Sequence, residues 1–202
     1  MKCKSKGASC PPRRSPSFQG SSLSPSLTLS PLSDPWPSAG TILFQFAFCM
    51  VMTDTLLYWI HRSFHHPSLY RFHKQHHEYK SPIPISSEYY SIAEEVGTGF
   101  IPTLSGPLLL GRSMHMGVLL LWVAFRVCES ADAHSGYDLP FPLSVFSLPY
   151  IGRPADRHYF HHSVNVGNFG AFFCFWDWLC GTDVKWREWR ARVGMAGSGE
   201  GK

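Results

Sequence analysis

Long apolar runs separated by polar, histidine-rich stretches dominate the 202-residue chain. Residues 41–60 form the first run, and Asp54 is its only charge. Twenty helical residues extend ~30 Å, about the thickness of a hydrocarbon core, so this run is expected to cross a membrane. Because a charge is costly there, Asp54 should face protein. It shares a helical face with His61 and His65, which we predict to be its partners.

A second apolar stretch, residues 97–130, is broken by Gly-Arg-Ser at 111–113. Each half has ~15 residues, which is short for a membrane span. We therefore predict a helical hairpin that crosses with distortion, or dips into the bilayer, and returns to the side it left. Basic residues such as Arg62, Lys74 and Arg126 lie at or after the ends of the two apolar stretches, and the positive-inside rule places those regions in the cytosol.

The two ends of the chain differ in composition from its middle. Residues 1–40 are rich in Ser and Pro, are basic, and carry one acidic residue, Asp34. Such a segment cannot bury enough apolar surface to fold, so we expect a disordered tail or a cleavable targeting segment. A transit peptide would direct the chain to a plastid. The main domain is then residues 41–184, and the charged, Gly-rich residues 185–202 are expected to form a frayed tail.

The overall composition narrows the classes of protein. Charged residues make up 16% of the chain, aromatic residues make up 15%, and the net charge is +4. These values argue against a wholly disordered chain and against a nucleic-acid partner, for which the basic residues would have to cluster. A mild positive charge suits an anionic membrane surface. The six cysteines include no C-x-x-C pair, which favours reduced, packing thiols over a disulfide framework or a zinc site.

Eleven histidines are confined to residues 61–162, and most fall into three spaced groups. The groups have the patterns H-x-x-x-H, H-x-x-H-H and H-x-x-H-H. Residues three or four apart share a helical face, so each group can direct two or three imidazoles to one side. A further histidine follows the hairpin. The nine predicted metal ligands are His61, His65, His73, His76, His77, His134, His158, His161 and His162.

Nine imidazoles are too many for one ion, whereas two ions would each receive four or five and keep room for an exogenous ligand. Imidazole suits zinc, copper, iron and nickel, so the residue type does not name the metal. His66 is excluded because it points ~100° away from His65. His115 is excluded because the helix leading to His134 would place it ~28 Å away, at the opposite membrane face, as an interfacial histidine.

Carboxylates can orient metal-binding imidazoles from behind by accepting the second ring N–H. Candidates near the groups are Asp54, Glu78, Glu88, Glu94, Asp132, Asp138 and Asp156. From these we predict that Asp54, Glu88, Asp138 and Asp156 serve this role.

The order and spacing of the histidine groups resembles the fatty acid hydroxylase/sterol desaturase superfamily, and within it the sterol C4-methyl oxidases most closely. The resemblance covers about residues 41–184. It is carried by YWIHRSFHHPSLYRFHKQHHEYKSPI, ADAHSGYDLPF and DRHYFHHSVNVGNFGAFFCFWDWLCGTD. The HSGYD segment and the closing W-D-x-x-x-G-T-D pattern are the discriminating pieces.

This resemblance implies an all-α integral membrane helical bundle with a cytosolic, histidine-rich di-metal cap, located in the endoplasmic reticulum membrane. It implies two iron ions, which zinc can replace in preparations, dioxygen, and electrons from cytochrome b5 or an NAD(P)H-linked reductase. The implied reaction is stepwise oxidation of the 4-methyl group of a sterol, and the nine histidines correspond to the iron ligands. Aromatic residues could line or cap the lipid cavity, or anchor the core and the membrane interface: Tyr159, Phe160, Phe169, Phe172, Phe173 and Trp176.

Two departures from the family pattern bear on activity. The family usually has an apolar hairpin before the first histidine group, and the Ser/Pro-rich tail fills that place here. Ser91 stands where the family often has a histidine. Other functions also stay open: a sterol desaturase or a fatty acid- or aldehyde-acting member of the superfamily, a membrane zinc-binding protein, or an inactive relative. Histidines at helix ends, rather than in the middle of several spans, disfavour metal transport.

Overall fold

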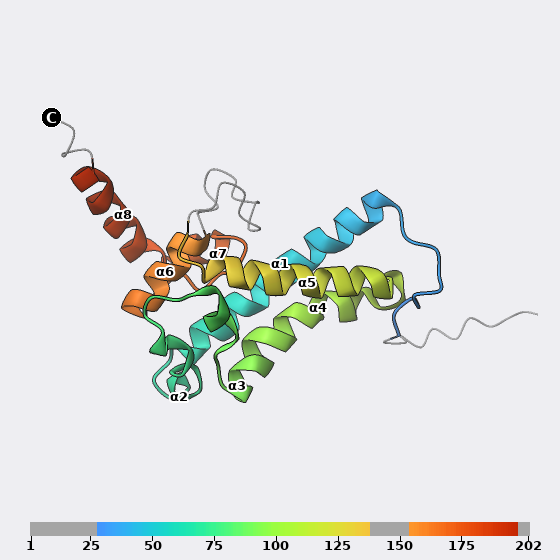
Figure 1. Ribbon diagram of the computed structural model, residues 1–202, viewed down its shortest axis with the longest axis horizontal. Helices are drawn as coiled ribbons and strands as arrows, with labels where there is room; N and C mark the ends of the chain where they lie inside the picture. The colour runs from blue at the N-terminus through green and yellow to red at the C-terminus, as the bar shows by residue number, and fades with distance from the viewer. Residues whose placement is uncertain (1–27, 138–153, 198–202) are drawn as a thin grey trace, which may run out of the picture.

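The computed structural model describes residues 28–137 and 154–197, and every named element within these ranges is a helix (Figure 1). The α-helices are α1 (Ala39–Phe64), α2 (Tyr70–His73), α3 (Ile92–Glu94), α4 (Ile101–Leu110), α5 (Met116–Ala133), α6 (Pro154–Val164), α7 (Phe175–Leu179) and α8 (Val184–Gly197). Short 3-10 helices occupy His76–Glu78, Pro84–Glu88 and Gly111–Ser113, and a π-helix occupies Glu95–Phe100. The predicted all-helical character is therefore confirmed.

Helix α1 contains the first apolar run and extends it at both ends to 26 residues. It begins where the Ser38 side chain accepts the N–H of Thr41, as an N-cap residue does. Among the described residues, α1 is the one helix long and apolar enough to cross a membrane. Large apolar side chains such as Leu43, Phe44 and Val51 remain exposed on its surface, which suits a helix surrounded by lipid.

The second apolar stretch folds back on itself at the predicted break. Helix α4 ends at Leu110, and Gly111 adopts a positive φ of 49°, which glycine tolerates without a Cβ clash. Helix α5 then returns beside α4, and the Trp122 indole N–H donates to the carbonyl of Thr103 across the two helices. The chain therefore forms a helical hairpin at the predicted break, and the side of the membrane to which it returns stays a prediction.

Close packing joins this hairpin to α1. A Cβ at Gly106 would lie 2.8 Å from the Cα of Cys49, so the small residue lets α4 approach α1 closely. The Thr53 hydroxyl donates to the carbonyl of Pro102 over 3.0 Å. The adjoining apolar core is formed by Cys49, Met50, Met114, Val118, Trp122 and Phe172.

Parts of the two expected tails pack against the main domain. Although residues 1–40 were expected to be a tail, residues from 28 onward pack on the start of α5, where Ser30 exchanges backbone hydrogen bonds with Met114 and Met116. Residues 1–27 lie outside the described part. The expected C-terminal tail begins as helix α8. It is held by Trp189 against Phe160 and by further contacts to α6, because its tryptophans supply an apolar anchor among the charges.

Candidate metal centre

The structure brings all nine predicted histidines to one end of the helical assembly and divides them into two neighbouring groups. Within each group the potential ligand nitrogens lie within 4.8 Å of one another. The five-histidine group consists of His61, His65, His73, His77 and His161, and the four-histidine group consists of His76, His134, His158 and His162. The groups are adjacent, since the ring centroids of His77 in the first and His162 in the second are 4.6 Å apart.

Backbone carbonyls fix the orientation of four of these rings. The Nδ1 atoms of His61 and His161 lie 3.1 and 2.6 Å from the carbonyls of Phe169 and Gly167. In the other group, the Nδ1 atoms of His134 and His162 contact backbone carbonyls at 2.7 and 3.0 Å. A carbonyl can only accept, so each Nδ1 carries the proton, and a neutral imidazole then presents a bare lone pair at Nε2.

The Nε2 atoms within each group face one another. In the five-histidine group, Nε2 of His73 lies 3.1 Å from Nε2 of His61 and 2.9 Å from Nε2 of His77. In the other group, Nε2 of His158 lies 2.9 and 3.0 Å from the Nε2 atoms of His134 and His162. Ring nitrogens this close must share a proton or a cation, and imidazole nitrogens gathered in this way fit metal ions of the kind that imidazole favours.

Two further nitrogens support the same fit. The Nε2 atoms of His65 and His161 are buried without a hydrogen-bond partner among the described residues. A buried polar atom without a partner is costly and therefore calls for an explanation. Both atoms belong to the five-histidine group, so a shared cation would satisfy them together with the three opposed nitrogens.

Burial keeps the imidazoles in the neutral form that binds metal. Desolvation lowers the pKa of His76 to about 4 and that of His134 to about 3, and neighbouring histidines push both in the same direction. For His158 and His161 the same two causes lower the pKa well below the usual value. The nitrogens are thus unprotonated at neutral pH and do not have to release protons before binding a cation.

Glu94 places a carboxylate against a ligand candidate. Its Oε1 lies 2.7 Å from Nδ1 of His73, and both side chains are buried. Ser91 positions this glutamate, because its hydroxyl accepts the Glu94 N–H and donates to the carbonyl of Phe72, next to His73. Ser91 is therefore a structural support for the site.

The prediction that Asp54 pairs with the histidines is wrong. Its Oδ1 instead accepts the backbone N–H groups of Ala171, Phe172 and Phe173, at 3.0, 2.8 and 3.0 Å. Asp54 lies on the predicted face of α1, but a loop from much later in the sequence, rather than the histidines, contacts its carboxylate. That loop carries Phe169, whose carbonyl contacts His61, so Asp54 acts on the site through the loop.

Asp177 holds the same loop and was missed as a site residue. Its two oxygens accept the N–H groups of Phe169 and Gly170 at 2.9 Å, and the hydroxyl of Thr182 at 2.6 Å. Asp177 and Thr182 belong to the W-D-x-x-x-G-T-D pattern. The pattern itself could have indicated that Asp177 has a structural role, but only the fold shows that it holds the loop whose Phe169 carbonyl contacts His61.

Two of the other three predicted carboxylates contact side chains that are not metal-ligand candidates. Glu88 accepts hydrogen bonds from Ser87 and Tyr90. Asp156 forms an ion pair with Arg190 at 3.0 Å. Asp138 lies outside the described residues. These carboxylates were predicted only because they lie near the histidine groups in sequence. Nearness in sequence does not show in which direction a side chain points.

The two excluded histidines lie outside both groups. Nδ1 of His66 is hydrogen bonded to the Ser68 hydroxyl at 2.8 Å. His115 caps α5, where its Nδ1 accepts the N–H of Gly117 and its Nε2 donates to the carbonyl of Asp34. His115 is buried, and its place at a membrane interface stays a prediction. Both of its nitrogens are used, and eighteen helical residues separate it from His134.

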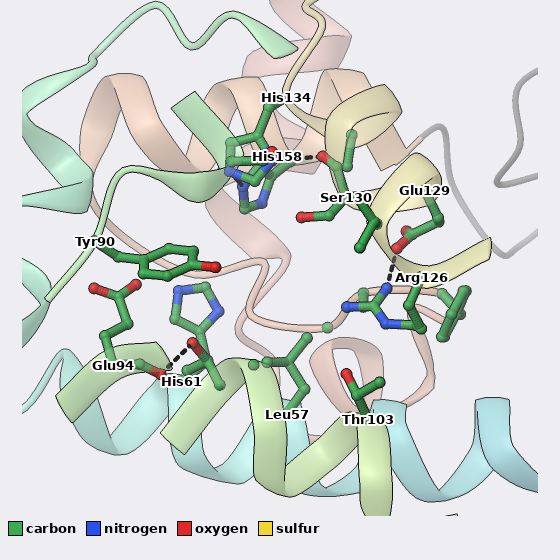
Figure 2. A pocket seen from close by; sticks show the side chains of 18 of the residues that line it. Leu57, His61, Tyr90, Glu94, Thr103, Arg126, Glu129, Ser130, His134 and His158 are labelled. Atoms are coloured by element: carbon green, nitrogen blue, oxygen red, sulfur yellow. Dashed lines mark hydrogen bonds and ion pairs between the residues drawn. The ribbon is translucent and has the colours of Figure 1, made fainter. Parts of the chain in front are cut away.

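A cavity of about 290 Å³ adjoins the histidines (Figure 2). His61, His73, His76, His134 and His158 line one part of it. Apolar side chains from α1, α4 and α5 line another part, namely Leu57, Leu104, Val123 and Val127. Of the six aromatic residues considered from the sequence, Phe169, Phe172 and Phe173 line the cavity. The shape and polarity suit an apolar molecule whose one end reaches the histidines.

Fold and site together define a helical protein with a two-part histidine cluster beside a largely apolar cavity. The chain belongs to the fatty acid hydroxylase family, whose model matches residues 46–182. This range includes all nine histidines of the two groups. No solved structure matches the chain.

Several curated proteins are similar to this chain. Very-long-chain aldehyde decarbonylase GL1-11 of Oryza sativa subsp. indica is 41% identical over 161 residues, which is 78% of this chain and 59% of that protein. Methylsterol monooxygenase 2-2 of Arabidopsis thaliana is 40% identical over 160 residues, which is 77% of this chain and 58% of that protein. The C-4 methylsterol oxidase of Schizosaccharomyces pombe is 34% identical over 165 residues, which is 79% of this chain and 54% of that protein. This chain thus spans between 54% and 59% of the length of these relatives.

Proposed function

We propose that this protein is a membrane-bound, non-haem di-iron oxygenase that hydroxylates a lipid, and that the target is the C4-methyl group of a sterol. The observation that carries the proposal is the convergence of nine buried imidazole nitrogens, in groups of five and four, beside an apolar cavity. Family membership and the similarity to methylsterol oxidases support the reaction class.

The nine histidines would hold the two iron ions, five around one and four around the other. Iron with dioxygen would supply the oxidising power needed to break an unactivated C–H bond. The protein's own groups hold the site in place. Glu94 and four backbone carbonyls orient the rings so that Nε2 points inward. The cavity wall excludes water and presents the apolar body of the substrate to the histidines.

A membrane location follows from the lipid substrate. Helix α1 would span the bilayer and the α4–α5 hairpin would enter it, so that the chain is multi-pass with the histidines on the cytosolic side. We further propose the endoplasmic reticulum membrane as its location, with electrons supplied by cytochrome b5 or an NAD(P)H-linked reductase. A lipid could then enter the cavity laterally from the bilayer.

A second candidate function rests on the relatives named as very-long-chain aldehyde decarbonylases, which match at least as well as the methylsterol oxidases. The same histidine cluster would then act on an aldehyde carried by a linear chain. Lipid profiling separates the two candidates. Loss of the protein would cause 4-methylsterols to accumulate under the first, and long-chain aldehydes under the second.

The metal site is tested by His76→Ala, with His66→Ala as the matched control. His76 is buried in the four-histidine group, whereas His66 is exposed and outside both groups. We expect the wild-type chain and His66→Ala to contain two irons and to support growth of a yeast that lacks its own C4-methylsterol oxidase. His76→Ala should lose iron and fail to support growth. Zinc without iron in active wild-type protein would contradict the di-iron proposal.

A further inference from the structure

The wall of the cavity contains a charged pair that the metal site does not use. Arg126 and Glu129 both line the cavity and form an ion pair three residues apart on α5. Their side chains are nearly inaccessible to solvent, at 11% and 2% exposure. Figure 2 shows the pair across the cavity from His61. A buried ion pair in an apolar wall costs desolvation free energy. A contribution to stability alone is therefore a weak explanation for its presence.

Each partner also keeps a polar atom without a hydrogen bond. Within the described ranges, Nε of Arg126 and Oε1 of Glu129 are buried and unpartnered. One atom is a donor and the other is an acceptor. Because the two groups that carry them are in contact with each other, the pair offers a donor and an acceptor at one place in the wall.

The surroundings of the pair hold it in position. The Arg126 guanidinium lies over the ring of Phe172, with 4.9 Å from its central carbon to the ring centroid. Phe172 is itself fixed by the hydrogen bond from its N–H to Asp54. Val123 and Val127 on the same helix line the adjacent wall. The pair is therefore a preorganised polar spot among apolar side chains.

We propose that Arg126 and Glu129 bind a hydroxyl group of the lipid and thereby orient it toward the histidines. A hydroxyl oxygen can accept from Nε–H of Arg126 while its proton is donated to Oε1 of Glu129, which satisfies both atoms. A carboxylate would face the negative Glu129, and an aldehyde oxygen would leave Glu129 without a donor. The complementary ligand is an alcohol carried on an apolar body. This inference rests on the proposed lipid-oxidising function and specifies the substrate class as a hydroxylated lipid.

The test measures binding instead of turnover. The probes are a 4,4-dimethylsterol with its 3-hydroxyl group and the 3-deoxy analogue, each titrated against the full chain in detergent. We expect the wild-type protein to prefer the hydroxylated probe by on the order of 100-fold, because a site built around a hydroxyl leaves its polar groups unpaired with the deoxy analogue. Equal binding of the two probes by the wild-type protein would overturn the inference.

The double variant Arg126→Met with Glu129→Leu removes both polar groups without leaving one charge unpaired. It should bind the deoxy probe like the wild-type protein, while its preference for the hydroxylated probe falls to within about threefold. The exchange variant Arg126→Glu with Glu129→Arg keeps an ion pair if the double variant does not fold, and it should also lose most of the preference. Leu120→Ala, on the exposed face of α5, is the control and should keep it.

The outcomes separate this inference from the oxygenase proposal. A chain that distinguishes the probes through Arg126 and Glu129 but never oxidises the sterol would support the hydroxyl site and count against the oxygenase. A chain that oxidises the sterol while the double variant keeps its full preference for the hydroxylated probe would support the oxygenase and count against the hydroxyl site.

Discussion

Replacing Asp54 distinguishes the role found in the structure from the role expected from the sequence. The carboxylate accepts three backbone N–H groups through one oxygen, and it is 2% exposed. A hydrogen bond to a charged acceptor contributes about 1 kcal/mol more than one to a neutral acceptor, so Asp54→Asn should cost about 3 kcal/mol of unfolding free energy. Asp54→Ala would leave three buried donors unpaired at roughly 1–3 kcal/mol each, which approaches the whole stability of a typical domain.

The assay compares thermal unfolding and iron content of the purified chain. Asp54→Asn should unfold several degrees lower than the wild-type protein, yet it should retain most of its iron below the transition because no histidine loses a direct partner. Asp54→Ala should not accumulate as folded protein. If Asp54→Asn unfolded like the wild-type protein but had lost its iron, Asp54 would be acting on the histidines directly, and the loop-holding role would be refuted.

Three further predictions follow from the site. Glu94→Gln should weaken iron binding by roughly 10–100-fold in a chelator competition, whereas Glu88→Gln should leave it unchanged; equal effects would contradict the special role of Glu94. Gly167→Ala should destabilise the chain much more than Gly181→Ala, as urea unfolding would show. Both glycines have positive φ, but only at Gly167 would a Cβ meet a backbone atom, at 2.0 Å. In the metal-free protein, stability should be highest above pH 6.5 and should fall on acidification toward pH 4. The pKa of His76 is lowered to about 4 in the folded state, so the unfolded chain binds more protons in this window. Urea unfolding at pH 7.5 and at pH 5 checks the sign, and greater stability at pH 5 would contradict it.

Local spacing was sufficient to predict the apolar helices and the histidines that gather at the site. The run at 41–60 is long and apolar, and the structure makes it the central part of α1. The i, i+3, i+4 spacing directs several imidazoles to one side regardless of what surrounds them, so the candidates could be selected before any fold was known. The glycine at 111 likewise indicated the turn between α4 and α5.

The parts that spacing could not predict depend on contacts between distant segments. Asp54 and the loop at 171–173 are more than a hundred residues apart in the chain, and a helical-face argument has no information about what that face meets. Glu94 contacts His73 because Ser91 caps a short helix beside it, which is again a contact between segments. The order of residues 28–38 and of α8 arises from packing on α5 and α6.

By itself, the sequence determined which residues this protein can use: an apolar helix of membrane length and nine histidines with ligand spacing. The tertiary structure decided how the nine histidines divide into five and four and which atoms form hydrogen bonds with their rings. It also decided where a buried ion pair lies in the apolar wall of the cavity. The physical reason is that spacing along a helix is a local property of the backbone, whereas the partner of a side chain is set by whichever segment packs against it.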